Sequence, residues 1–307
     1  MNWFSIAGIL LLLHQDDVSD RLLVNHQGKT AIIVNRSDYA LPALPLMDMD
    51  KFDHLLHDLD REIYQGPQNA RFGDDGKIIP EQIGFKLDRT RFTDQFQTFF
   101  FSNGNNTIEA ARKPIYPRVD SELIAHLREK TIGHYVTYFN SRNKNRAHNI
   151  TLAAKAINNA VLFPGEIFSF NQAVGKRTKE KGYLRASVIV KGELSEGIGG
   201  GICQVSSTLF NAVDRAGLQI LQRYSHSRSV PYVLPGRDAT VSWDGPDFSF
   251  QNKYNQPILI RVYSGGGRMF VTIYSSDMIE HKPRIVHGTS KQLPEEIFIE
   301  TRKKTLR

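Results

Sequence analysis

Apolar and polar positions follow helical and strand-like patterns in the first third of the chain. Residues 21–36 and 107–112 alternate apolar and polar side chains as strands do, and Asp74-Asp75-Gly76 is a favourable turn between two apolar runs. Spacings of three and four residues predict two helices with these buried faces: Phe52, Leu55, Leu56, Leu59 and Ile63, then Phe92, Phe96, Phe99 and Phe100. We therefore expect a small α+β module centred on residues 48–113, within a first domain over 21–118.

The rest of the chain predicts a second α+β domain over residues 133–276. A proline-containing connector and a short helix over 121–130 precede it, and Asn149 is a suitable N-cap for its first helix. Strands are predicted, the last two as a hairpin, over 135–140, 167–170, 186–190, 258–264 and 268–275. Residues 277–307 are polar and mixed in charge, which predicts a loosely packed tail.

The composition is that of a basic globular protein. With 39 Lys and Arg against 32 Asp and Glu, the 307-residue chain has a net charge of +7 and a pI near 9.4. This balance favours polyanionic partners such as nucleic acid, anionic lipid or the acidic polymers of a cell wall, although a solvated basic surface is the simpler interpretation. The sequence has no helix-turn-helix, RNA-binding aromatic signature or zinc-finger spacing, so we predict no nucleic-acid partner.

An apolar run stands near the N-terminus. Trp3–Leu13 has the length of a signal-peptide core and is too short to span a bilayer. No basic residue precedes it, and no small-residue cleavage site follows it. Two interpretations stay open for residues 1–20. One is an atypical export signal, which would allow a peripheral or N-terminal membrane association, and the other is an apolar N-terminal strand.

The most informative stretch surrounds Cys203, the only cysteine of the chain. Three glycines at 199–201 precede it, and apolar residues then recur at helical intervals up to a stop signal at Gly217. Cys203 falls in the first turn of this predicted helix and off its apolar stripe. The positive end of the helix dipole lowers the pKa of a thiol there and favours the nucleophilic thiolate. A small, buried structural cysteine is the alternative interpretation.

A thiolate nucleophile needs a general base. His226 ends a predicted strand over 218–226, and Asp238, on a predicted neighbouring strand over 237–243, would orient its imidazole. The chain order resembles papain-like and transglutaminase-like enzymes, as an analogy of layout only. Cys203, His226 and Asp238 are the predicted catalytic residues. A structural histidine and a turn-closing aspartate are the alternatives.

Substrate and oxyanion contacts are predicted around the same turn. Glycines permit a tight turn and a close approach of substrate, while the cysteine N–H and a glutamine side chain can donate to an oxyanion. The candidate substrate-binding and oxyanion residues are Gly200, Gly201, Gln204, Ser207 and Arg237. The alternative for Ser207, and for Ser206 beside it, is a helix-surface or capping hydroxyl. Histidines and carboxylates form no metal-ligand pattern, so neither a metal nor another cofactor is predicted.

Four segments resemble the VanW family, in this order: 165–175 (GEIFSFNQAVG), 199–208 (GGGICQVSST), His226-Ser227 and 235–243 (PGRDATVSW). Residues 48–113, with NARFGDDGKIIPEQIG at their centre, are similar to the peptidoglycan-binding module that often precedes this domain. Together they give the arrangement of YoaR-like members of the family. The sequence departs from that pattern in its atypical export signal, and we expect no further wall-binding module after residue 276.

The resemblance implies a fold, a location and a reaction. The fold is α+β: a small wall-binding module, then a domain with its cysteine at a helix N-terminus packed on an antiparallel sheet. The implied location is extracytoplasmic, in the cell wall or on the outer face of the cytoplasmic membrane, with peptidoglycan stem peptides and anionic wall polymers as partners. The family takes its name from glycopeptide-resistance gene clusters. Some members have been linked to L,D-transpeptidase cross-linking through the aligned cysteine.

Two functions follow for this chain. In the first, the Cys203 thiolate forms a thioester with the third residue of a stem peptide, expels D-alanine and passes the acyl group to an amine, or to water in the related hydrolase. In the second, the chain is a non-catalytic wall-binding or glycopeptide-resistance accessory protein. Cys203 is then structural, and these basic residues hold wall polymers: Arg142, Lys144, Arg146 and 176–181. A rapidly alkylated thiol with a depressed pKa favours the enzyme, and an inert buried thiol favours the binder.

Overall fold

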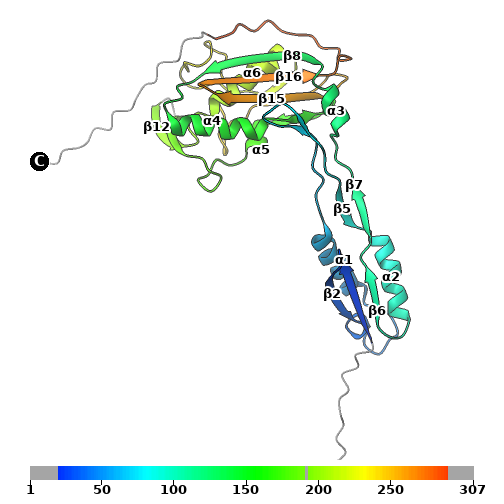
Figure 1. Cartoon of the computed structure of the whole chain (residues 1–307). Coiled ribbons are helices and arrows are strands. Elements are labelled where there is room, and N and C mark those ends of the chain that lie inside the picture. The colour runs from blue at the N-terminus through cyan, green and yellow to red at the C-terminus, as the bar shows by residue number, and fades with distance from the viewer. Residues whose placement is uncertain (1–19, 191–192, 290–307) are drawn as a thin grey trace, which may run out of the picture. The chain divides into compact units, whose positions relative to one another are not determined.

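Helices and mainly antiparallel strands are mixed along the described residues, which confirms the predicted α+β class (Figure 1). The computed structural model describes residues 20–190 and 193–289. The chain divides into two compact units: one contains the residues up to 69 together with 81–118, and the second contains 70–80 together with the residues from 119 onward. The predicted export signal falls almost wholly outside the described residues.

The first unit is built around a three-stranded sheet with the order β2–β1–β6. β1 and β2 pair antiparallel, and β6 runs parallel to β1. A separate antiparallel pair joins β5 to β7. The strands and the short 3-10 helix of this unit are β1 (Arg21–His26), β2 (Lys29–Asn35), η1 (Arg36–Tyr39), β5 (Gly84–Leu87), β6 (Asn106–Glu109) and β7 (Arg112–Ile115).

Helices α1 (Met49–Ile63) and α2 (Arg89–Phe101) supply most of the core of the first unit. Each helix begins after an aspartate, Asp48 or Asp88, whose side chain accepts a hydrogen bond from a backbone N–H of the first turn. The buried residues of both helices are those that the sequence pattern predicts. Local periodicity was sufficient to predict these buried residues because each helix has one buried face.

The second unit has a four-stranded antiparallel sheet with the order β8–β16–β15–β9. It contains β3 (Arg71–Phe72), β4 (Ile78–Ile79), α3 (Ser121–His126), β8 (Lys130–Tyr138), α4 (Lys144–Ile157), β9 (Ala160–Leu162), β10 (Ile167–Ser169) and α5 (Phe170–Val174). It continues with β11 (Arg185–Val190), β12 (Glu193–Ile198), α6 (Ile202–Arg215), β13 (Gln219–Gln222), β14 (Ser249–Gln251), β15 (Ile258–Gly265) and β16 (Arg268–Ser275). The predicted C-terminal hairpin is β15–β16.

Successive side chains of β15 point to opposite faces of this sheet, and both faces are packed. Ile258 and Ile260 join the main core with α4 and α6, which pack against the long strands (Figure 1). Leu259 points to the opposite face, where it joins a second cluster with α3 and the β3–β4 hairpin. Helix α6 therefore packs on an antiparallel sheet, as the family resemblance implies.

The β3–β4 hairpin, predicted within the first domain, belongs to the second unit. The side chain of Asn159 attaches it to the rest of the unit: its Oδ1 accepts the Phe72 N–H at 3.0 Å, and its Nδ2 donates to the Phe72 carbonyl at 3.0 Å. Asn159 has a φ of 67°, a left-handed conformation that asparagine tolerates better than most residues. This attachment joins segments 87 residues apart.

Three further local predictions differ from the structure. Helix α4 begins at Lys144 after the N-cap Asn143, so Asn149 lies inside the helix rather than at its start. The predicted strand over 237–243 is irregular chain. Within the predicted polar tail, Ile279 and Val286 are buried in the main core. In the described part of the chain, no helix is long and apolar enough to cross a membrane, and no three His, Cys, Asp or Glu side chains gather as metal ligands.

Candidate active site

Glycines shape the entry of the chain into α6. Gly199 and Gly201 have φ angles of +84° and +106°, and Gly201 is the N-cap of the helix. A Cβ on Gly200 would lie 2.6 Å from the backbone of β11, so a side chain there would collide with it. The buried Asn149 of α4 donates to the Gly200 carbonyl at 3.0 Å, which explains why this asparagine serves the loop and not the helix cap.

Cys203 is therefore fixed as the second residue of α6. Its N–H is one of the four at a helix start that have no intrahelical partner. The side chain is partly buried. The sequence-predicted position of the thiol, in the first turn of a helix, is the observed one.

The buried Asp238 holds the ring of His226. Its Oδ2 accepts two hydrogen bonds from this residue, one from the backbone N–H and one from Nδ1, both at 2.6 Å. Arg223 in turn donates from Nε to the Asp238 carbonyl at 2.7 Å. His226 lies beyond the end of β13, in irregular chain, so the carboxylate rather than a strand sets the orientation of the ring.

The thiol of Cys203 and the ring of His226 lie close enough to shift each other's pKa. Because Asp238 occupies Nδ1, Nε2 is the ring nitrogen available to the thiol. Burial alone would raise the pKa of Cys203, but the interactions with His226, Val241 and Thr240 together outweigh it, so the pKa is lowered. Burial alone would lower the pKa of His226, but its interactions with Cys203 and Asp238 raise it. Both directions favour a thiolate beside an imidazolium.

The carboxyl of Asp238 completes this arrangement. Burial opposes its charged form, but the two hydrogen bonds from His226 and the charge of the ring lower its pKa below the ordinary value. The aspartate therefore stays ionised while the histidine is protonated, and it stabilises the imidazolium.

Residues 239–241 also pack against the thiol, in addition to His226. The sulfur lies 3.5 Å from the Val241 carbonyl and 3.8 Å from the Thr240 hydroxyl. Ser206 and Ser207 of α6 hold this segment: Ser206 donates to the Ala239 carbonyl at 2.5 Å, and Ser207 accepts the Ala239 N–H at 2.8 Å. Both serines are buried, so they are not hydroxyls on a solvated helix surface.

The other predicted oxyanion residues have structural partners. Both N–H groups of the Gln204 amide are used, at 3.0 Å each, by the Thr137 hydroxyl and the Tyr138 carbonyl, and its Oε1 accepts from Arg146. Arg237 donates to Asn211 and to Asp214, from Nε and Nη2 respectively. The side chain of Gln204 thus has no N–H left for an oxyanion. The N–H of Cys203 is the donor that the fold leaves next to the sulfur, because the N–H groups of Ile202 and Gln204 bond to the carbonyls of Gly199 and Gly201.

Two residues near the thiol were not found from the sequence. Tyr232 is buried, and burial, together with the charge of Cys203, raises the pKa of its hydroxyl well above the ordinary value. Arg177 stands in the basic stretch that the sequence analysis assigned to wall polymers, yet its charge acts on Cys203. No local pattern marks either residue, because both are brought to the site by irregular chain.

Comparison with known proteins assigns the chain to a family. Residues 145–274, which include the three candidate catalytic residues, match the family model described as "VanW like protein". A protein of Bacillus subtilis (strain 168) named "Uncharacterized protein YoaR" is 56% identical over 297 residues, which are 96% of this chain and 98% of that protein. This chain belongs to the VanW family.

Another VanW-family relative is more distant. "Vancomycin B-type resistance protein VanW" of Enterococcus faecalis (strain ATCC 700802 / V583) is 28% identical over 157 residues, which are 50% of this chain and 57% of that protein. No solved structure matches the chain. The predicted VanW and YoaR-like resemblance is thereby confirmed. The family match begins at residue 145, so peptidoglycan binding by the first unit stays a prediction.

Proposed function

We propose that this VanW-family protein is a cysteine acyltransferase of the bacterial cell wall that forms peptidoglycan cross-links of the L,D-transpeptidase type. One observation carries the proposal: a thiol at a helix start lies beside a histidine whose ring and backbone N–H both bond to a buried carboxylate. A nucleophile, a base and an orienting group in this relation are the parts of nucleophilic acyl transfer.

In the first half of the reaction, the Cys203 thiolate attacks the carbonyl carbon of the third residue of a stem peptide. The backbone N–H of Cys203, in the first turn of α6, stabilises the oxyanion. As the intermediate collapses, a C–S bond replaces the C–N bond, and the His226 imidazolium gives its proton to the leaving amine of D-alanine. A thioester and a neutral imidazole remain, and Asp238 keeps the ring in place.

In the second half, the side-chain amine of a neighbouring stem peptide attacks the thioester. His226 takes a proton from the attacking amine, a C–N bond forms, and the C–S bond breaks to return the thiolate. The product is a cross-link between two stems, and the enzyme ends in its starting protonation state. With water as the acceptor, the same steps give a carboxypeptidase.

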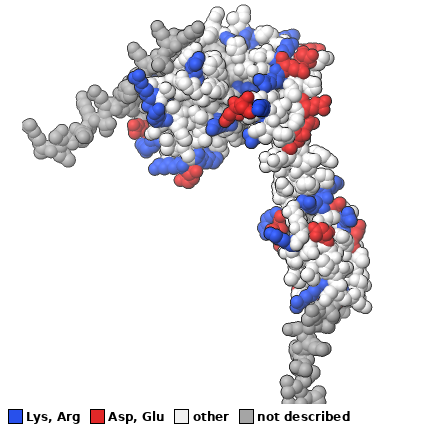
Figure 2. Space-filling view, viewed as in Figure 1, with Lys and Arg blue, Asp and Glu red and all other residues white. Residues whose placement is uncertain are grey.

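The cell-wall substrate is supported by family membership and by charge. One relative is named as a vancomycin resistance protein, which associates the family with an antibiotic context. The chain carries a net charge of +7, and Lys and Arg outnumber Asp and Glu on the side of the second unit that carries the start of α4 (Figure 2). Anionic wall polymers are suitable partners for such a surface. We place the protein outside the cytoplasm, in the wall or on the outer face of the membrane.

The test is incubation of the full chain, and of Cys203→Ala, with muropeptides that carry tetrapeptide stems. Mass spectrometry of the products should show free D-alanine and cross-linked dimers with the wild type only. Mass spectrometry of the protein should show an acyl adduct, which peptide mapping assigns to Cys203. His226→Gln should lower the rate of D-alanine release by about 10²–10⁴-fold, the usual contribution of a general base.

Circular dichroism and thermal unfolding establish that each variant is folded. If the folded wild type releases no D-alanine and forms no adduct, the acyltransferase proposal is wrong. Binding of both proteins to purified sacculi under that outcome would favour the non-catalytic wall-binding alternative.

A further inference from the structure

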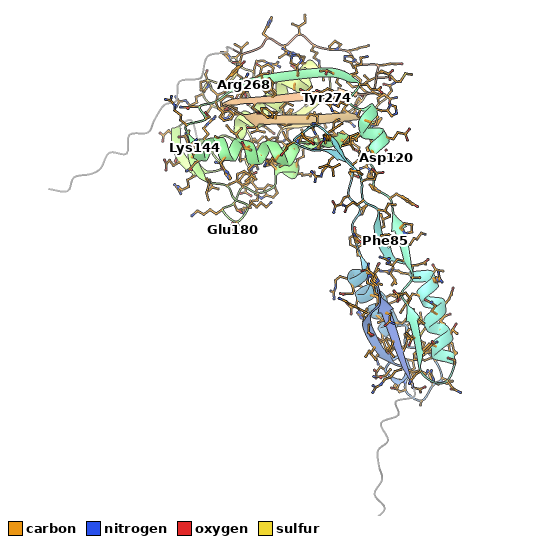
Figure 3. The ribbon with its side chains drawn as sticks, viewed as in Figure 1. Phe85, Asp120, Lys144, Glu180, Arg268 and Tyr274 are labelled. Carbon is orange, nitrogen blue, oxygen red and sulfur yellow. The ribbon has the colours of Figure 1, made fainter. Side chains whose placement is uncertain are left out.

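Arg177 differs from its neighbours in the loop between α5 and β11. Lys176, Lys179, Glu180 and Lys181 are exposed, and Glu180 lies at the loop (Figure 3), whereas Arg177 is half-buried. Its stem packs against the glycine run that leads into α6, since a Cβ on Gly199 would lie 3.2 Å from the Arg177 Cβ. Its guanidinium is therefore directed into the unit rather than into solvent.

A neutral amide holds the guanidinium. Nη2 of Arg177 donates to the Asn171 Oδ1 at 2.7 Å. Asn171 is fixed in turn, because its Nδ2 donates to the Ser242 and Pro246 carbonyls at 2.9 and 3.1 Å. Nη1 of Arg177 is buried and has no hydrogen-bond partner among the described residues. A buried donor without an acceptor costs free energy and needs an explanation.

No carboxylate of the described residues forms an ion pair with Arg177. Asp247 acts on it through its charge, but the oxygens of Asp247 already accept hydrogen bonds from Ser169 Oγ, the Asn171 N–H and the Phe248 N–H. Burial lowers the pKa of Arg177, and the charge of Cys203 acts in the opposite direction. A guanidinium stays protonated in proteins, so a positive charge without a direct counter-ion lies within electrostatic reach of the nucleophile.

We propose that Arg177 binds the carboxylate of the acyl donor beside Cys203, so that the site selects donors with a free carboxylate near the scissile bond. Arg and carboxylate form paired, charge-assisted hydrogen bonds, which would satisfy Nη1. Because the side chain is only half-buried, a change of rotamer can present Nη1 to a ligand. The proposal deepens the proposed acyltransferase function: the enzyme removes a terminal residue and does not cut within a longer peptide.

The anion selectivity can be measured without any peptide substrate. Iodoacetate and iodoacetamide alkylate the same thiolate but differ in charge, so the ratio of their rate constants reports the electrostatic potential at Cys203. The full-length wild type, Arg177→Gln and Arg177→Lys are compared with Lys176→Gln, which removes the same charge from an exposed neighbour. Rates are taken at a pH where the iodoacetamide rate of every variant has reached its plateau, so that differences in thiolate fraction cancel.

We expect Arg177→Gln to lower the iodoacetate-to-iodoacetamide ratio by about tenfold, a moderate effect for one nearby charge in a partly buried site. Lysine should restore part of the ratio, and Lys176→Gln should leave it near the wild-type value. An unchanged ratio in folded Arg177→Gln, or an equal fall in Lys176→Gln, would overturn the proposal.

A second measurement uses tetrapeptide donors whose terminal carboxylate is free or amidated. The wild type should prefer the free acid through KM, and Arg177→Gln should lose this preference. A wild type that releases no terminal residue from either donor, while the alkylation ratio still depends on Arg177, would contradict the acyltransferase function but not the anion site. A wild type that uses both donors equally would overturn the carboxylate proposal while the acyltransferase function stands.

Discussion

Replacing Asp238 with asparagine tests whether the carboxylate maintains the thiolate. The side chains of His226 and Asp238 are only 5% and 8% exposed, so water gives little screening. Two charged hydrogen bonds of 2.6 Å become neutral ones, and each such change costs about 1 kcal/mol. The backbone bond is present in both protonation states, so only the ring bond changes their ratio: about 1 kcal/mol lowers the population of the thiolate–imidazolium pair about fivefold relative to the neutral pair.

The assay is the rate of iodoacetamide alkylation as a function of pH. Because the pKa of Cys203 is lowered, the wild-type rate should stay near its plateau down to a pH at which an ordinary thiol is protonated. In Asp238→Asn the curve should move to higher pH. The two proteins should then differ most at low pH and converge above the ordinary pKa of a thiol.

Asp244→Asn is the matched control, because it removes the same charge from an exposed position of the same loop. Its alkylation curve should overlie that of the wild type. If folded Asp238→Asn also retains the wild-type curve, the carboxylate does not support the thiolate, and the assignment of Asp238 as the orienting group fails.

Three other predictions concern residues at the start of α6. Gly200→Ala should destabilise the fold by about 2–4 kcal/mol in urea unfolding, because its Cβ would lie 2.6 Å from backbone atoms, whereas Gly288→Ala, where nothing lies within 4 Å, should be nearly neutral. Gln204→Leu removes the three hydrogen bonds of a buried amide and should cost about 2–4 kcal/mol, yet Cys203 should keep its alkylation rate in the folded fraction, since none of these bonds involves the sulfur. In wild-type protein, Cys203 should reach half-maximal alkylation at a lower pH than free cysteine, and coincident curves would refute an activated thiol.

Sequence patterns located the elements that have a single buried face. The stripes of α1 and α2 and the alternation of β15 and β16 fix those elements by local periodicity. Glycines at positive φ likewise placed the thiol in the first turn of α6. Asp238 could be proposed as a partner of His226 from chain order alone, but only the fold shows that it accepts hydrogen bonds from both the ring and the backbone N–H.

The sequence-based predictions failed where a segment far away in the sequence sets the surroundings of a residue. Ser206 and Ser207 were expected on a polar helix face, but residues 239–241 cover that face and use both hydroxyls. Because the carbonyl and N–H of Ala239 bond to these serines of α6, they are not available for strand pairing, and the predicted strand over 237–243 does not form. The buried guanidinium of Arg177 depends on Asn171 and the glycine run, and no local property distinguishes it from the exposed lysines around it.

The assignment of the β3–β4 hairpin has a practical consequence for dissecting this protein. Since residues 70–80 belong to the second unit while 81–118 belong to the first, the chain passes between the units three times. A truncation at residue 119 would retain the family-matched region but delete the hairpin that Asn159 holds and that covers Leu259. Such a fragment would expose an apolar sheet face and is expected to aggregate. Neither unit can be obtained intact by a single cut, and separating them requires a circularly permuted or internally deleted chain.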